Sequence, residues 1–198
     1  SCKLSVTASR GLTSLLAETL ENKPELKALA PDLVMKASGC PNSCGQHHVA
    51  AIGWQGGMKK VNGRPAPTYH LYLGGGVDPD KAHFGKLMAK VPARRAGDAL
   101  EALVRLYAAK KTEGEKPDAF FRRLTPDDVK AALAHVGDLT PANVTEQDFI
   151  DLGETRAFEV VDGEEVVGRG RATDLRHERV GVDRLASVAA LEHRQERD

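Results

Sequence analysis

Apolar residues recur at helical spacing in three parts of the chain. In residues 9–22, leucines stand at positions i, i+3, i+4 and i+8, which predicts an amphipathic helix with Ser9 as its N-cap. Residues 95–111 repeat this spacing and predict a second helix. Residues 125–137 predict a third helix, with Thr125 as N-cap, a proline at the first helical position and a glycine that closes it.

Other segments have the patterns of strands and tight turns. Residues 31–38 predict a strand, and residues 47–57 predict a helical turn followed by a strand. Residues 68–75 alternate between apolar and polar types until a run of glycines breaks the pattern. Asn62 and Gly63 predict a hairpin turn, because both residue types tolerate positive φ. Together these elements predict an α+β fold, in which a mixed β-sheet is flanked by helices.

Charge and composition narrow the class of protein. The 198 residues include 28 Lys and Arg against 28 Asp and Glu, a balance that argues against nucleic acid or an anionic membrane as partner. No apolar run approaches the roughly 20 residues of a membrane span. Three cysteines are an odd number, which favours a reducing, cytoplasmic compartment over a disulfide framework. The chain opens on Ser-Cys without a methionine, and we expect it to be a fragment, a processed product or an excised domain.

The stretch KASGCPNSCGQHHVAAIGWQGG, residues 36–57, holds Cys40 and Cys44. Four residues of separation let both sulfurs reach one metal centre from a helical turn. Glycines on both sides allow the backbone to approach a bulky inorganic group, and Pro41 stiffens the turn. Amides at a helix start would lower the thiol pKa and donate to cluster sulfurs. These features favour thiolate ligation, with two buried thiols in a glycine-rich turn as the alternative.

His47 and His48 offer a second interpretation of the same loop. With Cys40 and Cys44 they would make a zinc site of the Cys2His2 type. The separation of His47 from Cys44 is shorter than in known zinc fingers, and neighbouring histidines point to different sides of the chain. One histidine in the core or at a cofactor edge, with the other exposed, is favoured over zinc. Trp54 is expected in the core or on a strand face, as is Tyr69.

The segment GCPNSCGQ resembles the cluster-binding motif of the sirohaem-dependent nitrite and sulfite reductases. In that family, a C-x5-C pair and a later C-x3-C pair together hold one [4Fe–4S] cluster. The opening SCKLSVTASRGL is similar to the end of the first pair, so Cys2 matches its second cysteine. Later blocks such as HLYLGGGVD and DFIDLGETRAF are also similar, and the resemblance covers residues 1–160.

This resemblance implies two cofactors, a [4Fe–4S] cluster and sirohaem. It implies that Cys2, Cys40 and Cys44 are cluster ligands, that Cys44 also bridges to the sirohaem iron, and that the fourth ligand lies upstream of Ser1. Asn42 and Gln46 are candidate donors around the cofactors, with turn and cap chemistry as the alternative.

The resemblance also implies a reaction and its partners. The family reduces nitrite to ammonia or sulfite to sulfide with six electrons, which ferredoxin or a flavoprotein supplies. Most groups that bind the sirohaem carboxylates and the substrate anion would lie in a missing N-terminal half. In this chain the candidate contacts to those carboxylates, with surface charges as the alternative, are Lys36, Arg64, Arg94, Arg95 and Arg10. A non-catalytic iron–sulfur electron-transfer module and a zinc-stabilised domain are the alternative functions.

The expected domain division follows from the resemblance and from a shift in composition. Residues 1–137 would form the domain that binds the cluster and sirohaem, and residues 138–163 its C-terminal extension. In residues 164–198, 15 of 35 side chains are charged and every basic one other than histidine is arginine. That stretch does not match the family, and we expect an irregular, disordered or helical tail.

Overall fold

The computed structural model describes residues 5–160. Its helices are α1 (Ser9–Asn22), α2 (Pro24–Leu29), α3 (Ala96–Lys110), α4 (Pro117–Arg123) and α5 (Pro126–Ala132), with short 3-10 turns η1 (His47–Val49), η2 (Ala93–Arg95) and η3 (Glu146–Phe149). Its strands are β1 (Met35–Ser38), β2 (Ile52–Val61), β3 (Arg64–Leu73), β4 (Gly76–Asp78), β5 (Lys81–His83) and β6 (Lys86–Pro92).

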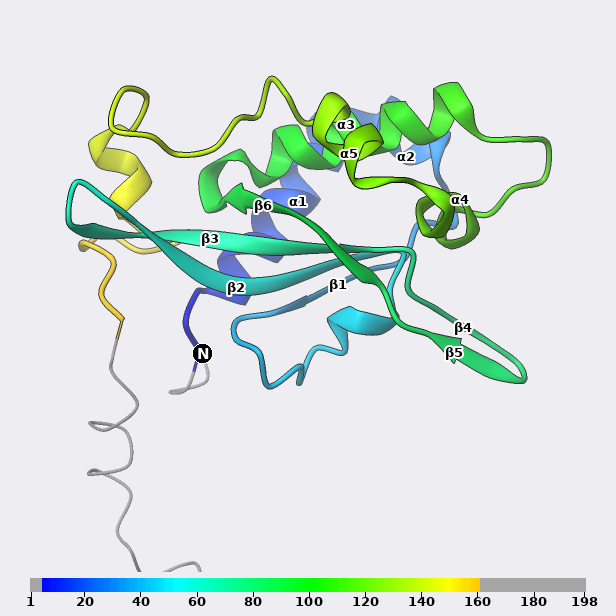
Figure 1. Ribbon diagram of the computed structural model, residues 1–198, viewed down its shortest axis with the longest axis horizontal. Coiled ribbons are helices and arrows are strands. Elements are labelled where there is room, and N and C mark those ends of the chain that lie inside the picture. Colours follow the sequence, from blue (N-terminus) through cyan, green and yellow to red (C-terminus); the bar gives the residue numbers. More distant parts are fainter. Residues whose placement is uncertain (1–4, 161–198) are drawn as a thin grey trace, which may run out of the picture. The chain divides into compact units, whose positions relative to one another are not determined.

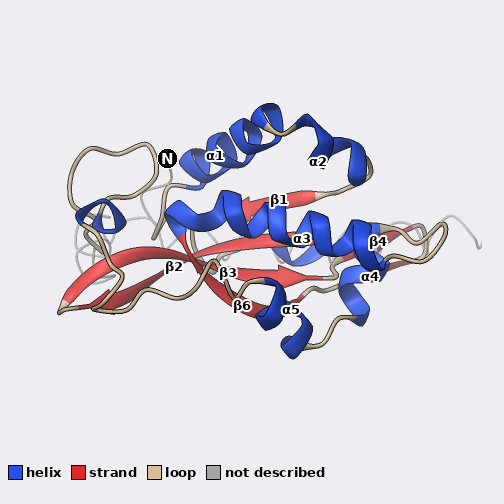
Figure 2. Cartoon of the chain, turned by 90° about the horizontal axis from the view of Figure 1, so that it is seen from above, coloured by secondary structure: helices blue, strands red, loops and turns tan. Residues whose placement is uncertain are grey.

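The main sheet is mixed and carries helices on one face. Its strand order is β1-β2-β3-β6, with β1 parallel to β2 and the other neighbours antiparallel. Helices α1, α2, α3 and α5 lie over one face, as both ribbon views show (Figure 1, Figure 2). Strands β4 and β5 form a separate two-stranded hairpin. The predicted α+β architecture is confirmed.

The long hairpin β2–β3 is the centre of the sheet. Its ten residue pairs run from Ile52 opposite Leu73 to Val61 opposite Arg64. The predicted turn joins them, with φ of 51° at Asn62 and 77° at Gly63. Two successive positive φ values give the tight turn a twist that matches the strands. This turn therefore sets the register that places alternate side chains of both strands on the helix side.

The core fills the space between the sheet and the helices. Trp54 and Tyr69 are fully buried there, as expected, with their rings edge to face at 6.5 Å between centroids. Helix α3 contributes the apolar positions that its spacing predicted, among them Leu100 and Leu103 at 0% exposure. Such side chains each contribute roughly 1.5–3 kcal/mol by leaving water. The helix layer is thus held to the sheet by apolar burial.

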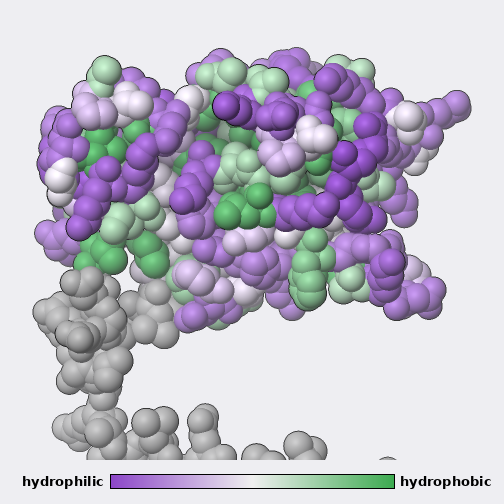
Figure 3. Space-filling model, in the orientation of Figure 1, coloured by the Kyte–Doolittle hydropathy of each residue, from purple (hydrophilic) through white to green (hydrophobic). Residues whose placement is uncertain are grey.

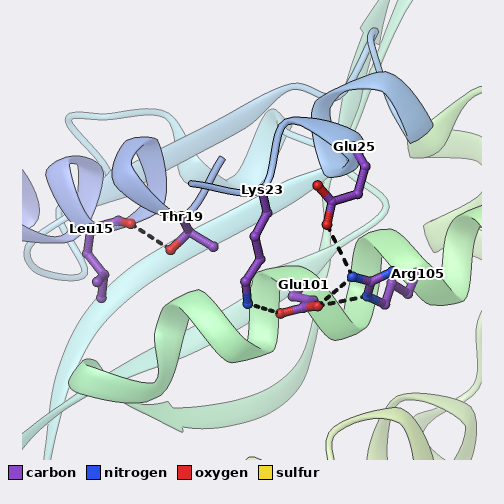
Figure 4. Close-up of polar contacts among 6 residues, drawn as sticks. All are labelled: Leu15, Thr19, Lys23, Glu25, Glu101 and Arg105. Atoms are coloured by element: carbon purple, nitrogen blue, oxygen red, sulfur yellow. Dashed lines mark hydrogen bonds and ion pairs between the residues drawn. The ribbon is translucent and has the colours of Figure 1, made fainter. Parts of the chain in front are cut away.

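Polar contacts align the helices with one another above this core. The Thr19 hydroxyl donates to the Leu15 carbonyl at 2.7 Å within α1 (Figure 4). Glu101 of α3 accepts from Lys23 at the α1–α2 junction and, at 2.8 Å, from Arg105 one turn along. Arg105 also reaches Glu25 of α2 at 3.4 Å. These pairs are half-exposed, so each adds little stability and mainly fixes the relative rotation of the helices.

Helix ends differ in part from the sequence prediction. Thr125 caps α5 as predicted, in a reciprocal pair with the Asp128 carboxylate and backbone amide. That helix ends earlier than expected, at Ala132, and Gly137 with φ of 64° closes the following turn instead. Ser9 is not the N-cap of α1: the cap position is Ala8, and no side chain at that position bonds to the helix.

Strand β6 was not predicted and forms one edge of the main sheet. Its side chains and those of α5 surround an apolar hollow lined by Met88, Val91, Leu133 and Val136. In the view of Figure 3, hydrophilic residues cover much of the surface, and hydrophobic ones show between them in several places. Pattern analysis did not predict this strand, because the sequence KLMAKVP mixes charged with apolar residues.

Several predictions from the sequence fall outside the described residues. Cys2 and the tail at 164–198 both lie there. The proposed division into 1–137, 138–163 and 164–198 stays a prediction. Within the described part of the chain, no helix is both long and apolar enough to cross a membrane.

Truncation of the α3 core should destabilise the whole domain. We expect Leu103→Ala to lower the free energy of unfolding by about 2–5 kcal/mol, because the site is sealed between helix and sheet. Leu87→Ala, at a side chain that is 48% exposed, should change it by less than about 0.5 kcal/mol. Urea titration followed by far-UV circular dichroism measures both, and equal losses in the two variants would contradict the assigned core.

Candidate functional site

The cysteine loop runs from the end of β1 to η1 and lies on the sheet face away from the helices (Figure 1). Cys40 is 8% exposed, whereas Cys44 is exposed, and both are free thiols. The Cys44 sulfur lies 4.0 Å from the Asn42 carbonyl oxygen, a weak contact within the loop. One thiol is therefore anchored in the fold and the other is presented at the surface.

The loop backbone is tightly folded after Cys40. Ser43 and Gln46 adopt left-handed conformations, with φ of 59° and 56°, which turn the chain around Cys44. The Gly45 amide donates to the Ser38 hydroxyl at 3.0 Å, across the neck of the loop. A Cβ at Gly45 would lie 1.9 Å from the Ala37 carbonyl oxygen, so only glycine permits this close approach.

The N-terminal segment packs directly on the residue before Cys40. The Gly39 carbonyl accepts from two successive amides, Val6 at 2.9 Å and Thr7 at 3.0 Å. A Cβ at Gly56 of β2 would lie 2.3 Å from that carbonyl oxygen and 2.1 Å from the Thr7 hydroxyl oxygen. Three backbones thus meet at one point, where side chains of any size would separate them.

Asn42 and Gln46 occupy exposed positions in the loop. The Gln46 side-chain oxygen accepts from the Lys36 ammonium at 2.8 Å. The backbone amide of Gln46 donates to the Ser43 carbonyl at 2.7 Å. Lys36 is therefore held beside the loop through Gln46. The predicted roles of Asn42 and Gln46 as donors to a cofactor stay predictions, and turn chemistry describes their present contacts.

The two histidines differ in burial. His47 is fully buried, its Nε2 atom has no hydrogen-bond partner, and its ring centroid lies 4.0 Å from that of His48 and 5.2 Å from that of Tyr72. Burial lowers the pKa of His47, and the neighbouring His48 lowers it further. The expectation of one core histidine is confirmed, while the other, His48, is half-buried rather than exposed.

A polar chain lies beside these histidines on the helix-free face of the sheet. Gln55 of β2 contacts the His70 Nδ1 atom at 3.3 Å and accepts from the Tyr72 hydroxyl at 3.2 Å. Burial lowers the pKa of His70, and the nearby charge of Lys90 adds to the shift. The sequence analysis missed this group. The alternation of Thr68, His70 and Tyr72 with apolar residues along β3 was the available signal.

Three of the candidate arginines contact groups within residues 136–149. Arg64 makes a bidentate pair with Glu146 and stacks 3.9 Å from the centroid of the Phe149 ring. Arg94 donates to the Gln147 carbonyl at 2.5 Å, and Arg95 donates to the Val136 carbonyl at 2.9 Å. These three arginines hold the segment around η3 against the sheet. Arg10 is exposed on α1.

The two thiols of the loop could serve as metal ligands, a chemistry that iron–sulfur clusters and zinc sites share. Within residues 5–160, no three side chains of the His, Cys, Asp or Glu types converge in the way that a metal ion needs. In particular, the histidines do not join Cys40 and Cys44 in a three-ligand group. Two thiols in a loop of closely approaching glycines match the ligand chemistry of iron–sulfur clusters. The described residues supply two such ligands.

Gly56→Ala should displace the cysteine loop. The added Cβ would collide with the Gly39 carbonyl and the Thr7 hydroxyl, so we expect a loss of about 1–3 kcal/mol in unfolding free energy. Gly57→Ala is the matched control, because a Cβ there meets only the His70 ring, at 3.3 Å, and the Thr68 hydroxyl, at 3.6 Å. Denaturant titration compares the two variants, and equal stability would contradict the close backbone contact.

Stability should fall as pH falls through the histidine range. Because His47 and His70 have lowered pKa values in the folded state, the unfolded chain takes up protons first. We expect about 1 kcal/mol less unfolding free energy at about pH 5.5 than at about pH 7.5. His47→Gln should reduce that difference, whereas His135→Gln, at an exposed position, should leave it intact. Urea titration at both pH values measures the unfolding free energies. Identical pH dependence in all variants would contradict the assigned role of His47.

Comparison with known proteins places this geometry in context. No family model matches the chain. Its sequence is 31% identical to a sulfite reductase [ferredoxin] of Mycobacterium tuberculosis over 134 residues, which are 65% of this chain and 24% of the relative. It is 27% identical to an assimilatory ferredoxin-dependent nitrite reductase of Haloferax mediterranei over 58% of this chain and 20% of the relative. It is 38% identical to a chloroplastic ferredoxin–nitrite reductase of Betula pendula over 42% of this chain and 15% of the relative.

A solved structure supports the same relation. The structure of the Mycobacterium tuberculosis NirA protein matches with a TM-score of 0.55 and 30% identity, over 65% of this chain and 24% of that protein. The chain spans about a quarter of the length of the first relatives that it matches. Over the matched residues, this chain is homologous to segments of proteins named sulfite reductase and nitrite reductase.

Proposed function

We propose that this chain is a cofactor-binding part of a sulfite or nitrite reductase. In this proposal Cys40 and Cys44 are ligands of a [4Fe–4S] cluster, and Cys44 also bridges to the iron of sirohaem. The cysteine loop carries the proposal: two thiols on a glycine-rich turn, at the spacing of the family's motif, on the helix-free face of the sheet. The named relatives support the reaction class.

The different exposure of the two thiols supports different roles. Cys40, buried against the fold, would fix one corner of the cluster. Cys44 projects from the turn between two left-handed residues, where a second group has room to approach its sulfur. The tight backbone at Gly45 fixes the turn that follows Cys44, because the Gly45 Cα packs against the Ala37 carbonyl and its amide donates to the Ser38 hydroxyl.

Cys2 is the proposed third ligand, and the fourth would lie upstream of Ser1. Support comes from the described residues that follow Cys2. Val6 and Thr7 hydrogen-bond the carbonyl of Gly39, immediately before Cys40. Three peptide units separate Cys2 from Ser5, a reach of roughly 11 Å at full extension. In this proposal, that short stretch of chain would carry Cys2 to the loop with the other two thiols.

The remaining roles follow from the same proposal. When bound, the cluster and sirohaem would pass six electrons from an external donor to nitrite or sulfite. Asn42 and Gln46 would donate hydrogen bonds near the cofactors, and Lys36, held by Gln46, would place a positive charge beside them. Ferredoxin, which the relatives' names mention, is the proposed electron donor, with a flavoprotein as the alternative. The site of action would be cytoplasmic.

The contacts of the arginines indicate which part of the proposed enzyme would bind the sirohaem carboxylates. Arg64, Arg94 and Arg95 bind groups of this chain itself, around η3, so they offer little to sirohaem carboxylates. In the proposed enzyme, most carboxylate and substrate contacts therefore come from the N-terminal half. If that half supplied none, the chain would be an electron-transfer module with a cluster alone.

Anaerobic reconstitution tests the proposed ligands. The full chain is treated with iron and sulfide in the presence of an external thiol, which can fill the coordination position of the fourth cysteine. We expect about four irons and four sulfides per chain, with the broad visible absorbance of a cluster. Cys44→Ser should lose most of both, whereas Ser43→Ala, at the neighbouring position, should retain them.

Two outcomes would contradict the proposed function. Full iron content in Cys44→Ser would exclude Cys44 as a ligand, and stoichiometric zinc without iron would favour a structural metal domain. Addition of sirohaem to the reconstituted chain, followed by optical spectroscopy, separates the reductase from a cluster-only electron carrier.

A further inference from the structure

Helix α1 lacks an N-terminal cap from its own sequence. The residue at its cap position, Ala8, has no side-chain acceptor, and the first turn contains no acidic residue. The first amides of a helix need acceptors from outside the helix, and their partial positive charge favours a nearby anion. Residues adjacent in sequence supply neither a side-chain acceptor nor an anion to this fourteen-residue helix, although the Thr7 carbonyl accepts from the Ser9 amide at 3.0 Å.

Asp151 supplies both from a segment 143 residues away. Its Oδ2 atom accepts from the Ala8 amide at 2.6 Å, and its Oδ1 atom accepts from the Leu152 amide at 2.8 Å. The side chain is 6% exposed. Burial raises the pKa of Asp151, while the two amides oppose that shift by donating to the carboxylate. Both carboxylate oxygens are thus committed to backbone amides inside the fold.

A second contact fixes the same helix end. A Cβ at Gly11 would lie 2.2 Å from the Leu152 carbonyl oxygen, so the first turn of α1 touches the backbone of the Asp151 segment directly. Leu152 itself is 7% exposed and belongs to the main core. Residues 151 and 152 therefore hold the start of α1 through a charged cap and through close packing.

The segment before α1, residues 5–7, is hydrogen-bonded to the residue that precedes Cys40. Val6 and Thr7 immediately precede Ala8 and donate to the Gly39 carbonyl. The Ser5 hydroxyl donates to the Thr7 carbonyl at 2.7 Å, which stiffens the segment. Gly39 is bonded to Cys40. A continuous series of hydrogen bonds and peptide bonds thus joins Asp151 to Cys40.

We propose that Asp151 is a positioning residue for the cysteine loop. By fixing the start of α1, it holds residues 5–7 against Gly39 and thereby keeps Cys40 in its buried position. The contacts stand without any cofactor, but the importance of Cys40 rests on the proposed function. In that function, the same cap also fixes the point at which the chain leads back to Cys2.

An amide cannot replace this carboxylate. In the Asp151→Asn variant, the side chain would have one acceptor oxygen for two backbone amides, and its NH2 group would face a second donor. The substitution therefore changes the hydrogen bonding with almost no change in side-chain volume. Asp128→Asn is the matched control, because Asp128 is likewise a carboxylate at a helix start, where it accepts from the Thr125 amide at 3.0 Å.

The rate at which the Cys40 thiol reacts with a reagent reports whether Cys40 stays in its buried position. One chain keeps only Cys40, through Cys2→Ser and Cys44→Ser, and another keeps only Cys44, through Cys2→Ser and Cys40→Ser. With Asp151→Asn, reaction of Cys40 with an aromatic disulfide reagent should accelerate about tenfold, the effect of losing one hydrogen bond. Cys44 should react at its original rate, and Asp128→Asn should change neither thiol.

Amide hydrogen exchange separates positioning from general destabilisation. In Asp151→Asn, exchange at Val6, Thr7 and Ala8 should accelerate, while the amides of Leu100 and Leu103 in α3 keep their protection. An unchanged Cys40 rate would overturn the proposal. So would a rise in Cys40 reactivity that accompanies faster exchange throughout α3, since that pattern reports global opening.

The unmodified chain provides a test that does not depend on folding of the variant. Its Val6, Thr7 and Ala8 amides should be protected from exchange, and exchange at the rate of a free peptide would overturn the proposal. None of these measurements requires iron. Loss of cluster assembly with normal Cys40 positioning would therefore count against the proposed function alone, whereas free movement of Cys40 despite cluster assembly would count against Asp151 alone.

Discussion

The meeting of three backbones at Gly39 is the contact on which the cysteine loop depends. The carbonyl of Gly39 accepts two amides from the segment that leads into α1, and Gly56 of β2 passes within contact distance of the same group. Such a hydrogen bond is costly to lose at a buried residue such as Thr7, because the freed amide then has no other partner. The absence of side chains at 39 and 56 is therefore as important as any residue present. The loop emerges from this point, and its geometry is inherited from the fold rather than from the loop sequence alone.

The two faces of the sheet have different roles. One face is covered by helices, and alternate residues of β2 and β3, such as Trp54 and Leu71, are sealed beneath them. On the other face the same strands carry Gln55, His70 and Tyr72, joined by hydrogen bonds. Since strand side chains alternate, the hairpin register that buries the apolar set necessarily gathers the polar set beside the cysteine loop. The proposed cofactor site and the hydrophobic core are thus consequences of one register.

The sequence predicted local features well and distant contacts poorly. Leucine spacing located α1, and Asn62-Gly63 located the hairpin turn, because each depends on residues close together in the chain. The C-x3-C spacing of Cys40 and Cys44 is likewise a local feature of the sequence. Ser9 failed as the cap of α1 because the acceptor comes from Asp151, 143 residues away, and no local pattern encodes such a contact. The partners of Arg64 and Arg94 around η3 could not be predicted for the same reason, because they become neighbours only after folding. Contacts of these arginines to sirohaem stay predictions.

The cap that Asp151 provides from a distant segment would help to fix the relative positions of the segments that carry the proposed ligands. The proposed ligands come from two segments that lie far apart in the sequence, one with Cys2 and one at residues 40–44. A local cap on α1 would stabilise the helix but leave its start free to move relative to the sheet. A cap supplied by Asp151 ties that start to a core segment, and Gly39 then relates the same start to the loop. Distances among thiolate ligands are set by the cluster and tolerate little error, so a site assembled from separate segments requires such rigid cross-connections. The burial of a carboxylate is a cost that a helix-capping role alone does not need, since exposed caps such as that of Asp128 serve α5 equally well. Positioning of the loop accounts for why the acceptor comes from inside the fold.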